Sequence, residues 1–149
     1  LTESTHFNIN SLVEQELFFY IINTQYKYTI NIETKLNEKL RDILFNYKIL
    51  STIFHNILGF IINEMSTSHI KRIIVETYEN NDNKIVIRIE GSVEDYEHRK
   101  IDDILYSSMY VTEDKYAPLI NAFLIAKSTS SQLKRIEGKN LILEFVINE

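Results

Sequence analysis

The sequence feature that most constrains the fold is the long apolar stretch between residues 46 and 65. Asn46, a residue type that helix N-termini prefer, stands directly before it. Apolar residues then recur with helical periodicity, and toward the C-terminal end they cover more than half of the helix circumference. They are Ile49, Leu50, Ile53, Phe54, Ile57, Leu58, Phe60, Ile61 and Ile62. The pattern predicts a helix over residues 46–65 that is buried on more than one side and forms the centre of the core.

Two β-hairpins are predicted C-terminal to this helix. The β-branched runs Ile70–Tyr78 and Lys84–Ile89 are separated by a short segment rich in Asn and Asp, which favours a turn. A second pair of runs, Gln132–Ile136 and Leu141–Ile147, flanks a short turn that contains Gly138. Alternation of apolar and polar residues in these runs is typical of strands with one buried face.

The remaining elements decide the fold class. A helix is predicted over residues 11–24 with Ser11 as its N-cap, and a strand with one wet face is predicted over Lys27–Thr34. A weak helix follows over residues 100–108 and a stronger one over residues 115–128. Helices and strands do not alternate along the chain as they do in a parallel doubly wound sheet. We therefore expect an α+β fold, a two-layer α/β sandwich with a mixed sheet covered on one face by helices.

Composition favours a single globular domain over residues 1–149 and argues against several classes of protein. The chain has no cysteine, which excludes disulfides and Cys-ligated zinc, and its net charge of -5 leaves no excess of Lys and Arg for nucleic acid. No apolar run approaches the length of a membrane span, and the start lacks a signal-peptide pattern. We expect a cytoplasmic domain without nucleic-acid or membrane contact. Because the chain begins at Leu1, we expect it to be a fragment of a longer protein.

Candidate catalytic groups are few. The four histidines lack the spacing that would direct two imidazoles to one metal ion, so no metal site is predicted. The hydroxyl-rich stretch Ser128–Ser131 has no G-x-S-x-G context and is interpreted as a loop or helix end. His55 and Asn56, which lie in the middle of the long helix, are interpreted as polar groups with partners in the core. A group of acidic residues is interpreted as a solvated face and not as catalytic carboxylates. This group comprises Glu94, Glu97, Asp102 and Asp103.

Several short stretches, in this order along the chain, resemble the ATP-binding domain of bacterial sensor histidine kinases. The opening segment Phe7–Val13 is similar to the one that enters the first helix of that domain. Asn46 occupies the place of the family's helix-capping aspartate, and Asn56-Ile57-Leu58 resembles the first half of its N-box, N-L-L-x-N-A. The resemblance covers almost the whole chain and implies the same α+β fold.

The sequence departs from the family at each position that the resemblance assigns to nucleotide. Phe60 stands where the second N-box asparagine holds magnesium, and a phenyl ring has no oxygen for a hard cation. The adenine-recognising aspartate falls at or near Gly91, while the neighbouring Glu90 is expected to point to the opposite face of its strand. Ile120 and Ala122 replace the glycines of the motif that opens the phosphate-binding helix. Three nucleotide determinants are thus altered together.

These departures imply a degenerate domain that acts in two-component signalling as a regulatory or protein-interaction module, with no cofactor and no enzymatic activity of its own. The segment 92–117, which matches the family's glycine-bearing lid, contains no glycine. One alternative is an active autokinase domain that binds ATP and magnesium, with Asn56 or Asn63 serving the metal and the Gly91 region serving adenine. Another is the C-terminal domain of a histidine phosphotransferase. His6 is too close to the first helix to be the phosphate-accepting histidine.

The resemblance also implies the partners of such a module. They are a response-regulator receiver domain, a histidine kinase, or a second copy of the chain that dimerises through upstream helices.

Overall fold

The computed structural model describes residues 3–23, 30–107 and 111–149, apart from the side chains of residues 22 and 23. Its helices are α1 (Ile9–Asn23), α2 (Tyr47–Glu64), α3 (His98–Tyr106) and α4 (Ala117–Ser128), with 3-10 turns η1 (Met65–Thr67) and η2 (Asp114–Tyr116). Its strands are β1 (Thr5–Phe7), β2 (Asn31–Leu36), β3 (Ile43–Phe45), β4 (Arg72–Glu79), β5 (Ile85–Gly91), β6 (Gln132–Ile136) and β7 (Leu141–Val146).

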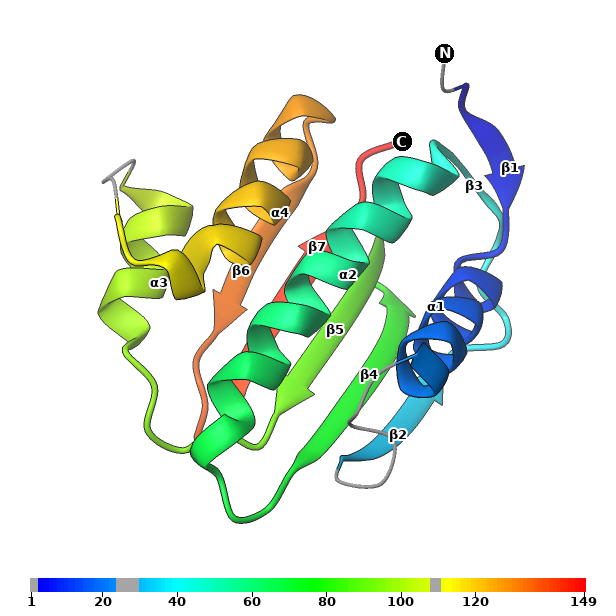
Figure 1. Cartoon of the computed structure of the whole chain (residues 1–149). Coiled ribbons are helices and arrows are strands. Elements are labelled where there is room, and N and C mark those ends of the chain that lie inside the picture. Colours follow the sequence, from blue (N-terminus) through cyan, green and yellow to red (C-terminus); the bar gives the residue numbers. More distant parts are fainter. Residues whose placement is uncertain (1–2, 24–29, 108–110) are drawn as a thin grey trace.

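Within the described residues, five strands form the main sheet in the order β2-β4-β5-β7-β6. Strand β2 runs parallel to β4, and the other neighbouring pairs are antiparallel. Figure 1 shows α1, α2 and α4 on one face of this sheet, with α3 beside the edge formed by β6. The predicted α+β sandwich with a mixed sheet covered on one face is confirmed.

Helix α2 is the centre of the core, as its sequence predicts. The side chain of Asn46 accepts a hydrogen bond from the backbone N–H of Ile49 at 3.0 Å, which satisfies one of the free donors at the helix start. Buried residues lie on several sides of the helix because it contacts the sheet, α1 and α4. They are Leu50, Ile53, Phe54, Ile57, Leu58, Phe60, Ile61 and Ile62.

Both predicted hairpins are present, but the predicted N-terminal elements have shifted. Helix α1 starts at Ile9, because the side chain of Asn8 accepts from the Asn10 N–H at 2.9 Å; Ser11 is an exposed residue within the helix and not its N-cap. In the described part of the chain, strand β2 runs from Asn31 and continues past the predicted end to Leu36, since its pairing with β4 extends that far. Residues 27–29 of that predicted strand lie outside the described residues.

The two helices predicted between the hairpins are confirmed with changed ends. The weaker one, predicted over residues 100–108, is α3 and begins at His98; residue 108 lies outside the described residues. The stronger one, predicted over residues 115–128, is divided into η2 and α4. Pro118 lies in the first turn of α4, where its missing N–H costs no helical hydrogen bond.

A small second sheet was not predicted. Strand β1 pairs antiparallel with β3, so that Thr5 lies opposite Phe45 and Phe7 opposite Ile43. Each strand has only three residues, too few to show alternation in a sequence.

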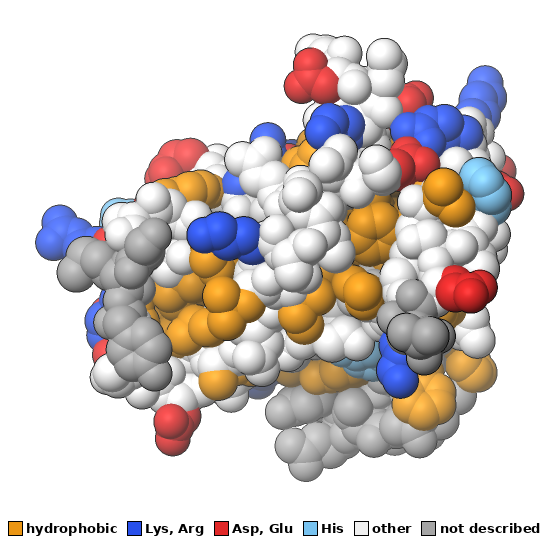
Figure 2. All heavy atoms as spheres, turned by 90° about the horizontal axis from the view of Figure 1, so that it is seen from above, with side chains coloured by type: hydrophobic (Ala, Val, Ile, Leu, Met, Phe, Trp, Pro, Cys, Tyr) orange, Lys and Arg blue, Asp and Glu red, His pale blue; other side chains and the backbone are white. Residues whose placement is uncertain are grey.

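In the view of Figure 2, Lys and Arg side chains are scattered between exposed hydrophobic and acidic ones and do not form one basic patch.

Candidate functional site

The positions that the resemblance assigns to nucleotide centre on the contact between α2 and α4, which we call the seam. Phe60 of α2 is fully buried there, and its ring lies 5.7 Å from the ring of Tyr116, centroid to centroid. Tyr116, contributed by η2, is also buried. On α4, Leu119 and Ala122 are fully buried. The seam is therefore filled by apolar and aromatic side chains.

The two asparagines proposed as alternative metal ligands do not lie together. Asn56 is half-buried one turn before Phe60, and its side-chain amide donates to the Thr52 carbonyl of its own helix at 3.0 Å. Asn63 is exposed. His55, in turn, pairs with the carboxylate of Glu16 on α1. The prediction that His55 and Asn56 have partners is confirmed, but their predicted place in the core is wrong, because both side chains are only partly buried.

Gly91, at the end of β5, lies beneath the C-terminal end of α2. A Cβ atom added at Gly91 would lie 2.3 Å from Cγ2 of Ile61 and 3.1 Å from the sulfur of Met65. Ile61 follows Phe60 and therefore stands where the N-box pattern has alanine. The space for a side chain at position 91 is thus occupied by the larger residue on the helix. Glu90 lies on the opposite face and accepts a hydrogen bond from Asn140 at 3.0 Å.

The residues that replace the glycines of the phosphate-binding motif lie within α4. Ala122 is fully buried, whereas Ile120 is half-buried and packs against the edge of the core. Both residues belong to the interior of the helix, so their backbone N–H groups lie within its span and not at its start. In this arrangement the helix begins at Ala117, five positions before Ala122.

One charge pair closes the seam at the end of α2. The Glu64 carboxylate is largely buried and lies 3.7 Å from Nζ of Lys115. The Lys115 ammonium lies 5.2 Å from the ring centroid of Tyr116. Burial, and then the nearby Glu64 charge, raise the pKa of Tyr116 to about 12. The seam therefore contains a tyrosine, Tyr116, that stays protonated at neutral pH. The neighbouring cation, Lys115, already pairs with Glu64.

The segment that matches the family's lid contains α3, which is attached to the edge strand β6. Both oxygens of Asp102 accept hydrogen bonds from the Arg135 guanidinium at 2.8 Å. The hydroxyl of Tyr106 accepts the backbone N–H of Arg135 at 2.7 Å, and the hydroxyl of Tyr96 contacts the same guanidinium. Hydrogen bonding from Arg135 holds the pKa of the Asp102 carboxyl below its usual value.

For Asp102 the interpretation as part of a solvated face is wrong, because its carboxylate pairs with Arg135. The other members of the acidic group are more exposed or pair weakly. Glu94 lies 4.0 Å from Lys139 with both side chains exposed, and Glu97 pairs with Lys100 at 3.2 Å. A sequence offers no signal for a partner that lies 33 positions away, on a different element.

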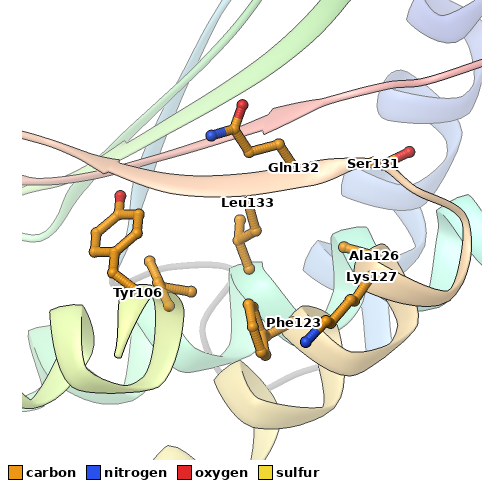
Figure 3. Close-up of a pocket in the computed structure, with 8 residues that line it drawn as sticks. Tyr106, Phe123, Ala126, Lys127, Ser131, Gln132 and Leu133 are labelled. Carbon is orange, nitrogen blue, oxygen red and sulfur yellow. The ribbon is translucent and has the colours of Figure 1, made fainter. Parts of the chain in front are cut away.

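A hollow of about 280 Å³ lies between α3, α4 and the start of β6. Figure 3 shows Leu133 pointing from β6 into the space between Tyr106 of α3 and Phe123 of α4. The hollow is lined by Leu105, Tyr106, Phe123, Ala126, Lys127, Ser131, Gln132 and Leu133. It was not predicted, because its lining comes from three elements that are separate in the sequence.

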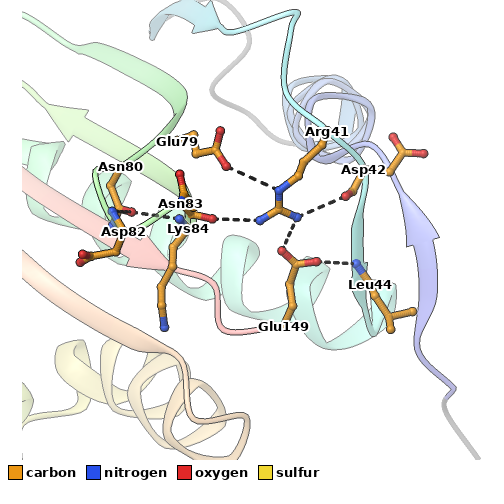
Figure 4. Close-up of polar contacts among 9 residues, drawn as sticks. All are labelled: Arg41, Asp42, Leu44, Glu79, Asn80, Asp82, Asn83, Lys84 and Glu149. Atoms are coloured by element: carbon orange, nitrogen blue, oxygen red, sulfur yellow. Dashed lines mark hydrogen bonds and ion pairs between the residues drawn. The ribbon is translucent and has the colours of Figure 1, made fainter.

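A polar cluster around Arg41 joins the small sheet to the main one. The Arg41 guanidinium contacts the carboxylates of Glu79 and Glu149 and donates to the Asn83 carbonyl (Figure 4). Glu149 also accepts the backbone N–H of Leu44, in β3, at 3.0 Å. The Arg41 guanidinium and the Glu149 carboxylate each contact more than one member of this cluster, so we interpret it as structural.

A second polar cluster lies on the face of the sheet opposite α2 and α4. The buried carboxylate of Glu144 accepts the hydroxyl of Tyr78 at 2.6 Å and lies 3.8 Å from both Arg88 and Lys134. Burial, and then the hydrogen bond to Glu144, raise the pKa of Tyr78 to about 12.

Among the described residues, no three His, Asp or Glu side chains gather closely enough to hold a metal ion. None of the described helices has the length and apolar character that a bilayer crossing requires.

Comparison with known proteins gives structural matches only. No protein-family model and no curated protein matches the sequence. The nucleotide-free catalytic domain of the histidine kinase ThkA superposes with a TM-score of 0.77 at 13% identity, over 97% of each chain. ThkA in complex with the response regulator TrrA gives 0.75 at 14% identity, over 97% of this chain and 41% of that one. Full-length ShkA in complex with AMPPNP gives 0.71 at 12% identity, over 98% of this chain and 30% of that one.

These matches establish the fold. The chain has the architecture of the ATP-binding catalytic domain of histidine kinases, as the resemblance in the sequence implies. It corresponds to less than half of the longer kinases ThkA and ShkA in those complexes.

Proposed function

From a histidine kinase catalytic-domain fold whose seam is filled by its own side chains, we propose a degenerate ATPase-type domain that serves two-component signalling as a regulatory or protein-interaction module. It works in the cytoplasm and does not bind ATP productively. The fold supplies the frame, and the function lies in the surfaces that remain once the nucleotide site is filled.

The observation that carries this proposal is the packing of Phe60 against Tyr116. In the family this position offers an amide oxygen to the magnesium that bridges the phosphates, and magnesium demands oxygen ligands in near-octahedral geometry. Here the same position presents a buried ring in contact with a second ring. A triphosphate would have to displace both rings, which together contribute several kcal/mol of burial at roughly 25 cal/mol per Å².

The packing around Gly91 supports the same proposal independently. Recognition of the adenine amino group needs a hydrogen-bond acceptor on the helix side of β5. Any side chain there would collide with Ile61, because an added Cβ already lies 2.3 Å from it. Compared with the family pattern, α2 has isoleucine in place of alanine at Ile61, and β5 has glycine in place of aspartate at Gly91. The larger residue on the helix fills the space that the smaller residue on the strand leaves, as the conversion of a pocket into close-packed core requires.

The partner that we propose is the receiver domain of a response regulator or a histidine kinase, with dimerisation through upstream helices as a further route. Support comes from ThkA, which was solved in complex with its response regulator TrrA. A histidine phosphotransferase remains a variant of the same proposal. An upstream helical hairpin that carries a histidine followed by an acidic residue would favour that variant.

Calorimetric titration of the chain with ATP and magnesium tests the proposal. We expect no binding heat and no change in the amide NMR signals of Phe60 and Tyr116. Full-length ShkA titrated with AMPPNP is the positive control, since that pair forms a complex. Micromolar binding by the chain would establish the alternative, an active kinase domain in which Asn56 or Asn63 serves magnesium and the Gly91 region serves adenine.

A further inference from the structure

The hollow between α3 and α4 lies beside an edge of the main sheet. Among the described residues, strand β6 is the last strand of that sheet and its one partner strand is β7. The backbone N–H of Arg135 donates to Tyr106 of α3, so it points away from β7. Along an antiparallel strand, the backbone N–H and C=O groups of successive residues point to opposite sides. Leu133 lies two positions before Arg135, so its N–H and C=O also point away from β7. Leu133 therefore offers a donor and an acceptor at the open edge.

The side chain of Leu133 faces the hollow from the same position. In a strand added to this edge, the residue opposite Leu133 would point to the same face of the sheet, about 5 Å from it. That residue would enter the space between Tyr106 and Phe123, which Figure 3 shows on either side of Leu133. Backbone pairing and the side-chain hollow thus specify the same position on a docked strand.

We propose that this edge and hollow form a docking site for an extended peptide segment of a partner protein, which adds as a short strand to β6 and places one large apolar side chain in the hollow. This inference goes beyond the proposed function, because it does not depend on whether nucleotide binds. A volume of about 280 Å³ lies just below the range of small-molecule pockets and suits one anchoring side chain. Main-chain pairing then gives affinity and the hollow gives specificity.

The charge at the rim specifies a second feature of the segment. Of the described residues that line the hollow, Lys127 is the charged one, and its ammonium lies 5.9 Å from the ring centroid of Phe123. Residues two positions apart on a strand share a face. An acidic residue two positions from the anchor would therefore lie on the helix side near Lys127. The favoured occupant is an extended segment with an apolar anchor and an acidic neighbour on the same face.

A second copy of the chain fits this site less well. If β6 paired with another β6 about Leu133, each Leu133 would stay buried in its own helix layer, since it is 3% exposed. Neither hollow would then be filled. A segment that is not already part of a folded sheet does not have this restriction.

The test uses the peptide Ac-TVTFTDT-amide, which favours an extended backbone and carries the anchor and the acid two positions apart. We expect the amide NMR signals of Leu133, Tyr106 and Phe123 to shift on titration, and hydrogen exchange at the Leu133 N–H to slow. Replacing the peptide's Phe by Ser should weaken binding by about tenfold or more, because anchors in pockets carry most of the binding energy. This arm needs no change to the protein.

Charge reversal gives the second arm. Lys127→Glu should weaken binding of the acidic peptide and strengthen binding of a peptide in which Asp is replaced by Lys. The control is Lys139→Glu, at a side chain that is 82% exposed and lies away from the hollow, and it should change the binding of neither peptide. Circular dichroism checks that both variants fold. The proposal is overturned if no shift appears at the β6 edge, if both variants bind alike, or if the chain alone dimerises with the Leu133 N–H protected.

Discussion

Helix α4 borders two regions of opposite character, the filled seam with α2 and the open hollow toward α3. In the seam, the aromatic rings of Phe60 and Tyr116 are buried and lie 5.7 Å apart, centroid to centroid. At the hollow, α3 is held to β6 by polar contacts, above all the hydrogen bonds between Asp102 and Arg135. These contacts fix the distance between α3 and β6 without filling the space between them. The comparison teaches that, among the described residues, α4 packs closely against aromatic side chains on the side of α2 and borders a hollow on the side of α3.

The largest expected effect comes from placing a side chain at Gly91, beneath the C-terminal end of α2. Gly91→Asp should lower the free energy of unfolding by about 4 kcal/mol, because it overpacks the contact with Ile61 and buries an unpaired carboxylate. Urea unfolding followed by circular dichroism measures the loss. A cost under about 1 kcal/mol would show that the contact between β5 and α2 adapts easily, and the proposed loss of nucleotide binding would lose its second support.

A double-mutant cycle isolates the packing term. Gly91→Ala should be destabilising in the natural chain and nearly neutral in an Ile61→Ala background, where the colliding methyl group is gone. The coupling energy should be about 1–2 kcal/mol, as found for residues in direct contact. Strictly additive effects would contradict the matched exchange of Ile61 and Gly91.

A smaller effect is expected on the open side, from the link that positions α3. Asp102→Asn keeps the shape of the side chain but removes the charge that Arg135 meets with two hydrogen bonds. It should lower the free energy of unfolding by about 2 kcal/mol, the typical value for charge-assisted bonds. Glu94→Gln is the matched control in the same segment, since its ion pair is exposed and should contribute little. Equal effects of the two changes would contradict the role assigned to Asp102.

The same link predicts a pH dependence. The pKa of Asp102 is lower in the folded state than the value of about 3.9 that is typical of an unfolded chain. Its contribution to stability is therefore complete above pH of about 4 and is lost as the pH falls through the folded-state pKa. The stability difference between the natural chain and Asp102→Asn should shrink in acid, as urea midpoints measured across this range will show. A constant difference would indicate that packing and not charge holds α3.

The sequence allows the frame of this molecule to be predicted better than its site. The periodicity around α2, the two hairpins and the Asn46 cap depend on local patterns, and each was predicted from residues near one another in the chain. The hollow and the Asp102–Arg135 link depend on tertiary contacts between α3, α4 and β6, for which a single sequence carries no local signal. Phe60 could be recognised as unusual only against a family pattern; that its ring meets Tyr116 required the structure.

The smallest expected effect compares the two tyrosines that border α4. Tyr106→Phe removes the acceptor of the Arg135 N–H, a bond of 2.7 Å, but Tyr106 is 54% exposed and water can replace it. The free energy of unfolding should fall by only about 0.5 kcal/mol, the low end for such bonds. Hydrogen exchange at the Arg135 N–H should accelerate while that at Leu133, which already faces the open edge, should not change. Tyr116→Phe, in the filled seam, should leave both rates unchanged. If Tyr106→Phe accelerated both rates equally, α3 would be protecting the whole strand edge, and the distinction between a guarded Arg135 and an open Leu133 would fail.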